Sequence, residues 1–312
     1  MSKKKIVGLI VIVVIIASVV LVAVLPGPRG LRPSGDSIAL VELAGPIQAT
    51  GAQSLLGGGG AITPDLVRDR LETAEDSPTV KAVVLRVDSP GGTVAASQEI
   101  ASLVRELSIP VVVSMGDMVA SGGYYISAPA DAIVAHPGTL TGSIGVIWSS
   151  FDPTGLFRDL GIEIDSVTAG RHKDMFLPGR LTPPRRRIVQ RMVNDMYDQF
   201  VSAVSRGREL PEAKVRKLAT GQLYTGTQAL RTGLVDELGD LDDAIARAEE
   251  LAGVDDADVI ELSPSFFEQL FGAAPTAGLF RWPWEVADGL NVKMLLLQDL
   301  LTNYNTPRYG GR

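Results

Sequence analysis

The sequence predicts an α/β fold, in which a largely parallel β-sheet carries helices on its faces. Short apolar runs rich in β-branched residues alternate with amphipathic segments along the body of the chain. The run Val80 to Val87, an apolar-faced helix and the run Pro110 to Met115 form one β-α-β unit. Strands joined in this way are parallel, so the loops that follow them meet at one edge of the sheet.

An apolar stretch near the N-terminus predicts a transmembrane helix ahead of this fold. Ile6 to Leu25 contains no charged residue, and at ~1.5 Å per residue it would span the hydrocarbon core of a bilayer. Lys3, Lys4 and Lys5 precede it, which places the N-terminus in the cytoplasm and the rest of the chain outside. A cleaved signal peptide is the alternative, but its apolar region usually has ~7–15 residues. A retained anchor is therefore the preferred interpretation.

The remainder divides into three parts. Residues 26–36 are rich in proline and glycine and form a linker that separates the membrane from the folded part. Residues 37–252 carry the alternating strands and helices. Residues 253–312 contain one more strand and an aromatic tail, for which a contact between subunits is one possible role.

Composition excludes several kinds of site. The chain has 312 residues, a net charge of −7 and no cysteine, which argues against nucleic-acid binding and excludes disulfides and thiolate metal sites. His136 and His172 are the only histidines, so a metal centre built on several histidines is also excluded. A Ser-His-Asp triad would have to use one of these two residues. No metal or cofactor is expected.

Apolar periodicity and capping residues place the individual elements. Thr63 followed by Pro64 is typical of a helix start, and Thr182 followed by two prolines begins a long helix in the same way. Alternation and β-branched content predict the strands. In chain order we expect strands over 37–43, 80–87, 110–115, 132–135, 162–167 and 258–262, and helices from 64, over 94–104, 183–206, 210–220 and 242–252.

Ser121 is the candidate nucleophile. The strand that ends near Met115 is followed by the small-residue turn Ala120 to Gly123, which opens a helix. A serine at this point holds its hydroxyl outside the sheet, beside the free N–H groups of the first helical turn. The alternative is structural, because serine commonly caps helices through its side chain. The glycines Gly91 and Gly92 end the preceding parallel strand, so their backbone is expected on the same side of the sheet.

Five ordered motifs resemble those of signal peptide peptidase A, a family of bacterial membrane-bound serine proteases. The resemblance covers about residues 37 to 251 and matches the short form of the family, without internal duplication. The motifs are Asp88–Gly92 (DSPGG), Met118–Ser127 (MVASGGYYIS), Leu140–Val146 (LTGSIGV), Gly170–Asp174 (GRHKD) and Gly226–Gly239 (GTQALRTGLVDELG). Together, in this order, they are specific, although each alone would be weak.

The resemblance implies a Clp-protease/crotonase-like fold, with a β-α-β superhelical core, and a Ser-Lys dyad. Ser121 would be the nucleophile and Lys173 the general base. Ser143 would orient the lysine, and the backbone of Gly92 and Gly122 would form the oxyanion hole. The family also forms ring-like or bowl-shaped homo-oligomers with active sites between neighbouring subunits, so Ser121 and Lys173 are expected to meet across an interface.

A lysine base sets conditions that can be checked. An exposed lysine has a pKa of ~10.4 and is protonated at neutral pH, whereas burial can lower that pKa by as much as ~3–5 units. We therefore expect Lys173 in a site walled by apolar groups, with the neighbouring Asp174 turned away. His172 is the competing base, and histidine is the commoner one. Neighbouring residues of an extended segment face opposite ways, so only one of the two can reach Ser121.

These observations predict a membrane-anchored serine endopeptidase that cleaves hydrophobic peptides, such as signal peptides left in the bilayer after preprotein processing. The predicted location is the cell membrane, with one span and an extracytoplasmic catalytic domain. Two alternatives stay open: an acyl-CoA-processing crotonase relative, which needs neither Ser121 nor Lys173, and a non-enzymatic membrane-tethered scaffold. Loss of activity in Ser121→Ala with an intact fold would separate the protease from both.

Overall fold

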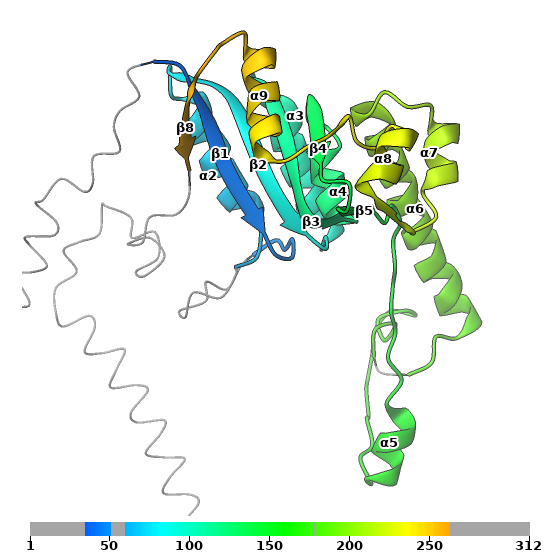
Figure 1. Ribbon diagram of the computed structural model, residues 1–312. Coiled ribbons are helices and arrows are strands. Elements are labelled where there is room, and N and C mark those ends of the chain that lie inside the picture. Colours follow the sequence, from blue (N-terminus) through cyan, green and yellow to red (C-terminus); the bar gives the residue numbers. More distant parts are fainter. Residues whose placement is uncertain (1–34, 51–59, 178, 263–312) are drawn as a thin grey trace, which may run out of the picture. The chain divides into compact units, whose positions relative to one another are not determined.

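The computed structural model describes residues 35–50, 60–177 and 179–262 (Figure 1). Contacts within the chain divide it into two units, Met1–Ser263 and Pro264–Arg312, and the second lies outside the described residues. The predicted membrane span Ile6 to Leu25 also lies outside them. In the part of the chain that is described, no helix is both long and apolar enough to cross a bilayer.

One sheet of eight strands organises the described residues, which confirms the α/β class. Its main path runs β6-β5-β3-β2-β1-β8, while β4 pairs with both β3 and β7. Every pairing is parallel except that of β5 with β6. The strands are β1 (Ser37–Ala44), β2 (Val80–Ser89), β3 (Val111–Ala120), β4 (Ala132–Ala135), β5 (Leu140–Gly142), β6 (Leu223–Thr225), β7 (Glu237–Leu238) and β8 (Asp258–Glu261).

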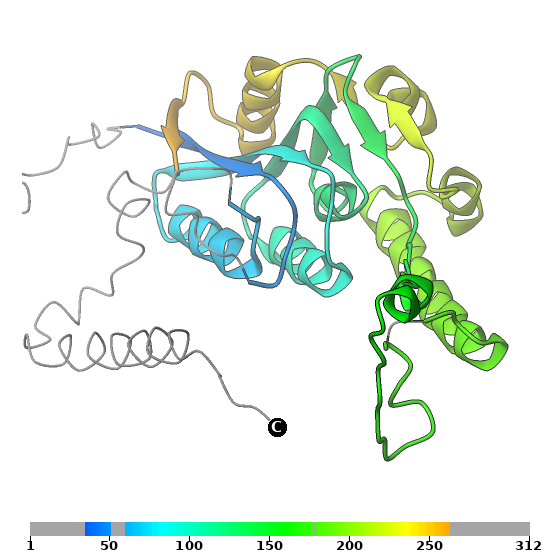
Figure 2. The ribbon, with the colours of Figure 1, turned by 90° about the horizontal axis from the view of Figure 1, so that it is seen from below.

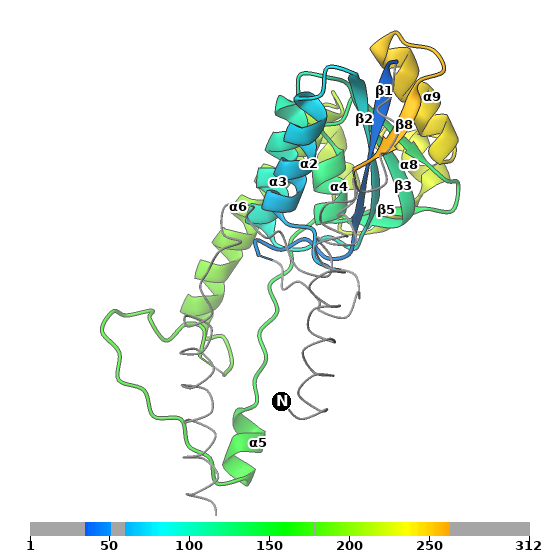
Figure 3. The ribbon, with the colours of Figure 1, turned by 90° about the vertical axis from the view of Figure 1, so that its left-hand side faces the viewer.

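Helices cover both faces of this sheet. Figures 2 and 3 show α2 and α3 on one face and α9 on the other. The helices are α2 (Pro64–Glu75), α3 (Val94–Glu106), α4 (Gly122–Ser127), α5 (Thr154–Asp159), α6 (Pro183–Gly207), α7 (Glu212–Leu218), α8 (Gly226–Thr232) and α9 (Leu241–Ala252). The long helix and the helix after Thr63 therefore lie where the capping residues predict them.

Alternation along the strands produces these two layers. Val83 and Leu85 of β2 are buried in the cluster that contains α2, α3 and α4, whereas Val84 is buried against α9. Both sets are fully buried, which is why β2 is an uninterrupted apolar run rather than an alternating one. Full burial of a valine or leucine stabilises the fold by roughly 1.5–3 kcal/mol.

The β-α-β unit has the predicted arrangement. Strands β2 and β3 are parallel, with Val83 opposite Val111, and α3 connects them. Strand β3 is longer than expected and extends to Ala120, since its first half pairs with β4 and its second half with β5. The loop after β2 and the turn after β3 consequently lie at the same edge of the sheet.

The prediction of a strand over residues 162–167 is wrong. These residues form no strand and are exposed; Ile162 and Ile164 are 49% and 50% exposed and Val167 98%. Alternating apolar residues form a strand only where another strand supplies hydrogen bonds, and none lies beside this segment among the described residues. Residues 146–177, which include α5, instead run out from the end of β5, and residues 179–182 lead into α6 (Figures 1 and 3).

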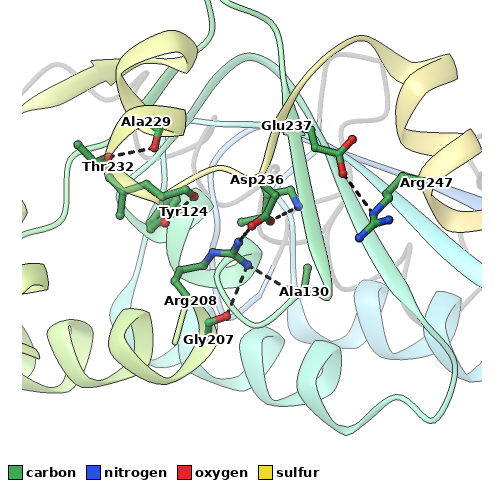
Figure 4. Close-up of polar contacts among 11 residues, drawn as sticks. Tyr124, Ala130, Gly207, Arg208, Ala229, Thr232, Asp236, Glu237 and Arg247 are labelled. Atoms are coloured by element: carbon green, nitrogen blue, oxygen red, sulfur yellow. Dashed lines mark hydrogen bonds and ion pairs between the residues drawn. The ribbon is translucent and has the colours of Figure 1, made fainter. Parts of the chain in front are cut away.

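An ion pair between a buried arginine and a partly exposed aspartate joins the end of α6 to the sheet. Arg208 pairs with Asp236, and the Arg208 side chain is 6% exposed (Figure 4). The guanidinium of Arg208 also donates to the carbonyl of Ala130 at 3.3 Å, and Asp236 accepts a hydrogen bond from the Ile133 N–H at 2.8 Å. Nearby, the Tyr124 hydroxyl donates to the Leu234 carbonyl at 2.8 Å, and burial raises the pKa of this tyrosine.

We expect Arg208→Ala to lower the free energy of unfolding by about 2 kcal/mol, because it leaves the partly exposed Asp236 without its counter-charge and the Ala130 carbonyl without a donor. Arg216→Ala is the matched control. Arg216 pairs with Asp198 at 2.7 Å, but both side chains are about half exposed, so the cost should stay below about 1 kcal/mol. Denaturant unfolding measures both values, and equal losses would contradict the role assigned to Arg208.

Candidate active site

Ser121 occupies a strained turn between β3 and α4. Its backbone angles are φ 53° and ψ −120°, in a region that residues with a Cβ rarely adopt. Such a conformation costs on the order of 1–3 kcal/mol and persists only where the surroundings impose it. Two hydrogen bonds do so here: the Ser121 N–H donates to the Gly142 carbonyl at 2.8 Å, and the Ser121 carbonyl accepts from the Tyr125 N–H at 2.9 Å.

The hydroxyl of Ser121 does not cap α4. Ser121 stands at the N-cap position, but its side chain makes no capping hydrogen bond. The structural alternative for this serine therefore fails. Residues behind it are tightly packed, since Tyr124 and Ile126 are fully buried, so the turn is a rigid support for a serine that is only partly exposed.

The loop after β2 leaves one backbone donor unused. The Gly91 N–H donates to Ser89 Oγ at 3.1 Å, and the Thr93 N–H donates to the Ile47 carbonyl at 2.9 Å. The Ile47 N–H in turn donates to the Gly91 carbonyl at 2.9 Å. Within the described residues, the Gly92 N–H between them has no hydrogen-bond partner.

This free donor lies beside the start of α4. A Cβ placed on Gly122 would come within 3.0 Å of the Gly92 nitrogen, and one placed on Gly91 within 2.6 Å of the Gly122 nitrogen. The Gly122 N–H belongs to the first helical turn and has no partner inside the helix. Two unpaired N–H groups therefore lie close together next to Ser121, an arrangement suited to an oxyanion.

Glycine is required in this loop because the backbone approaches too closely for a side chain. A Cβ on Gly92 would lie 1.8 Å from the Ile47 carbonyl oxygen, and Gly91 has φ +99°. Ile47, just after β1, thus fixes the loop from a position more than forty residues away. Sequence reasoning missed Ile47 because no local signal connects an isoleucine with so distant a loop.

Ser143 lies in the adjoining backbone. It follows β5 with φ 49°, and its N–H donates to the Gln222 carbonyl at 2.9 Å. The preceding residue, Gly142, is the one whose carbonyl accepts from the Ser121 N–H. Residues Ser121, Gly92, Gly122 and Ser143, from three separate sequence motifs, are thus brought to one region of the structure.

Lys173 is not part of this group in the single chain. It lies in the turns of residues 170–177, on the segment between β5 and α6, and its side chain is exposed. Its backbone N–H donates to the Gly170 carbonyl at 3.1 Å. Among the described residues its ammonium makes no hydrogen bond or ion pair, so the apolar surroundings expected for it are not supplied by its own chain.

The neighbours of Lys173 behave differently. Asp174 forms an ion pair with Arg185 in the first turn of α6, so its carboxylate is turned to that arginine. His172 is exposed. His136 follows β4, and its carbonyl accepts from the Thr139 N–H at 3.1 Å, as expected of a structural residue at a strand end.

A strained, uncapped serine beside two unpaired backbone donors has the layout of an acyl-transfer site in a serine hydrolase. The model of peptidase family S49 matches residues 104–255. The protein MJ0651 of Methanocaldococcus jannaschii is 37% identical over 285 residues, which cover 87% of this chain and 90% of that protein. The chain belongs to peptidase family S49.

Two further relatives define the type within this family. Protease 4 of Salmonella typhi is 40% identical over 70% of this chain, and the chloroplastic serine protease SPPA of Arabidopsis thaliana is 32% identical over 72% of it. The matched regions span 35% and 34% of those longer proteins. The chain is therefore a serine protease similar to signal peptide peptidase A, as its motifs predict.

The fold is also found in a solved structure. A mutant of the 1510-N membrane-bound stomatin-specific protease, in complex with a substrate peptide, aligns with a TM-score of 0.52. The alignment covers 77% of this chain and 97% of that one at 17% sequence identity. This likeness concerns the arrangement of strands and helices.

Proposed function

We propose that this protein is a membrane-anchored serine endopeptidase that cleaves hydrophobic peptides, such as signal peptides remaining in the bilayer, by means of a Ser121–Lys173 dyad. The observation that carries the proposal is the strained Ser121, whose hydroxyl makes no capping hydrogen bond and whose neighbour Gly122 lies close to the Gly92 nitrogen. In this proposal Ser143 orients the lysine, and the N–H groups of Gly92 and Gly122 form the oxyanion hole.

The mechanism follows from these roles. A neutral Lys173 amine removes the proton from Ser121 as its oxygen attacks the peptide carbonyl carbon. The carbonyl oxygen gains negative charge, which the N–H groups of Gly92 and Gly122 stabilise through hydrogen bonds. The lysine, now protonated, donates that proton to the leaving amine. Water then hydrolyses the acyl-enzyme with the same lysine as base.

The exposed apolar residues between β5 and α6 support an assembly of several chains. Several large apolar residues between positions 147 and 177 are unusually exposed to solvent: Ile147 is 86% exposed, Phe151 81%, Val167 98% and Phe176 62%. A neighbouring copy would cover them and would remove Lys173 from water at the same time. In the proposed homo-oligomer, this segment therefore delivers Lys173 to the Ser121 of an adjacent subunit.

The membrane anchor rests on the sequence and on one comparison. Ile6 to Leu25 is long enough to span a bilayer, with the lysines before it on the cytoplasmic side. The 1510-N protease is described as membrane-bound. An anchored catalytic domain on the outer side of the cell membrane would keep its active site close to substrates in the bilayer. Neither an acyl-CoA-processing enzyme nor a scaffold would need the strained Ser121.

Substrate preference tests the proposed function. We expect the full chain in detergent to cleave a peptide of leucines, valines and alanines at least about tenfold faster, in kcat/KM, than one of equal length with lysine and glutamate at alternate positions. Ser121→Ala is the control for contaminating protease. Equal or faster cleavage of the charged peptide would overturn the proposed substrate class, although not the assignment to the serine proteases.

A further inference from the structure

Asp174 is a carboxylate placed immediately after the proposed base. An unpaired carboxylate near an amine favours the ammonium form, which cannot accept a proton. The effect grows when the site is removed from water, because charges interact more strongly where the dielectric constant is low. A lysine base followed by an aspartate therefore needs something that neutralises the aspartate.

Arg185 provides that neutralisation. Its guanidinium forms an ion pair with the carboxylate of Asp174. The two side chains are 25% and 33% exposed, so this pair is partly withdrawn from solvent even in the single chain. Arg185 lies at the start of α6, near the positive end of the helix dipole, where an arginine gains nothing from the helix itself. Its position is explained by its partner.

Other charged groups lie near the Asp174–Arg185 pair. The rings of Trp148 and Phe176 lie with their centroids 5.3 Å apart, and Gly179 lies against Thr154. Together with the Asp174–Arg185 ion pair, these contacts place residues 146–152, α5 and α6 around the residues that surround Lys173. Asp152 is held by Thr154, whose hydrogen bonds lower the pKa of that carboxyl. The charged groups between β5 and α6 are Asp152, Arg158, Asp159, Glu163, Asp165, Arg171, His172, Lys173, Asp174 and Arg180, and those of α6 are Arg185, Arg186, Arg187, Arg191, Asp195, Asp198 and Arg206.

We propose that Arg185 is a positioning residue for the catalytic lysine, because it holds the Asp174 carboxylate away from Lys173 and cancels its charge. This inference rests on the proposed function, in which Lys173 is the base. Arg185 itself touches neither substrate nor Ser121 in this account. It acts only by keeping the adjacent carboxylate occupied, so that the amine loses its proton at a lower pH.

The test is the pH dependence of kcat/KM, which reports ionisations of the free enzyme. Arg185→Gln frees the carboxylate and removes a positive charge, and both changes favour the ammonium form. The acid limb of the profile is therefore expected to move to higher pH by about one unit. In Arg185→Gln/Asp174→Asn the carboxylate charge is also removed, and the midpoint should return to within a few tenths of a unit of wild type.

Two conservative variants and one control complete the design. Arg185→Lys keeps a cation for Asp174 and should leave the midpoint unchanged. Asp174→Asn alone should leave the midpoint unchanged or lower it, because Arg185 is then an uncompensated positive charge. Arg187→Gln removes an exposed arginine from the same helical turn, which makes no ion pair within the described residues, and should not move the midpoint.

A purely structural role for Arg185 gives a different result. Arg185→Gln would then lower kcat/KM equally at every pH, and Asp174→Asn would not restore it; this outcome would overturn the inference. Lys173→Ala is assayed alongside, because it tests the Ser121–Lys173 dyad independently of the role of Arg185. If Lys173→Ala stays active, the dyad is wrong. If it is inactive while Arg185→Gln has an unshifted midpoint, the dyad stands and only the role of Arg185 is lost.

Discussion

Replacing Ser121 by alanine is expected to lower kcat/KM for peptide hydrolysis by at least about 1,000-fold, because the nucleophile is removed. The Ser97 hydroxyl beside Gly122 cannot replace it, since Ser97 is buried and its hydroxyl donates to the Thr93 carbonyl. The free energy of unfolding should change little. Alanine has the same Cβ as serine and meets the same strain at φ 53°, and the serine hydroxyl contributes no capping hydrogen bond. Peptide cleavage and denaturant unfolding of the same preparations measure the two effects.

Ser121→Gly separates catalysis from stability more sharply. Glycine adopts this backbone conformation without the penalty for a Cβ, so this variant should be more stable than Ser121→Ala by about 1 kcal/mol while equally inactive. An inactive Ser121→Gly variant that is more stable than Ser121→Ala would show that the backbone strain at position 121 is kept for catalysis. Substantial activity in either variant would remove Ser121 from the nucleophile's role.

Lys173→Ala is expected to lower kcat/KM by roughly 100–10,000-fold, the range in which general-base catalysis usually contributes. Its melting temperature should match that of wild type, since Lys173 is exposed and its ammonium is unpaired within the described residues. His172→Ala is the matched control, because it removes the competing base one residue away from an equally exposed position. A large loss in His172→Ala with a small loss in Lys173→Ala would reverse the assignment of the base.

Much of the fold could be predicted from local pattern, and so could the residues that the strand ends bring together. Strands β2 and β3 read as apolar runs joined by a helix, which makes them parallel and places Gly92 and Ser121 at one edge. The resemblance added Ser143, whose neighbour Gly142 indeed contacts Ser121. These inferences succeed because a β-α-β unit converts neighbouring segments of sequence into a fixed spatial arrangement.

Other features depend on contacts that no local pattern contains. The segment at 162–167 alternates like a strand, but it lacks a neighbouring strand in the described residues and so forms none. Ile47 fixes the glycine loop from a distant point of the chain, and Arg185 reaches Asp174 from another element. Three adjacent arginines, Arg185 to Arg187, begin α6, and their sequence does not tell which of them has a partner; in the structure the first forms a partly buried pair.

Because Lys173 is exposed in the single chain, the proposed active site is complete only when several chains assemble. The residues around Ser121 are arranged within one chain, whereas the proposed base lies on a segment that runs out from the sheet and carries uncovered apolar side chains. If the site is shared, a chain without Ser121 can still supply the lysine to a neighbour, and a chain without Lys173 can still supply the serine.

Co-expression of Ser121→Ala and Lys173→Ala chains, each with a different affinity tag, measures this directly. After purification through both tags, mixed assemblies in which each site takes its serine and its lysine from different copies should recover about a quarter of wild-type activity, while either variant alone stays inactive. Mixed assemblies that form but show no hydrolysis would contradict a site shared between subunits.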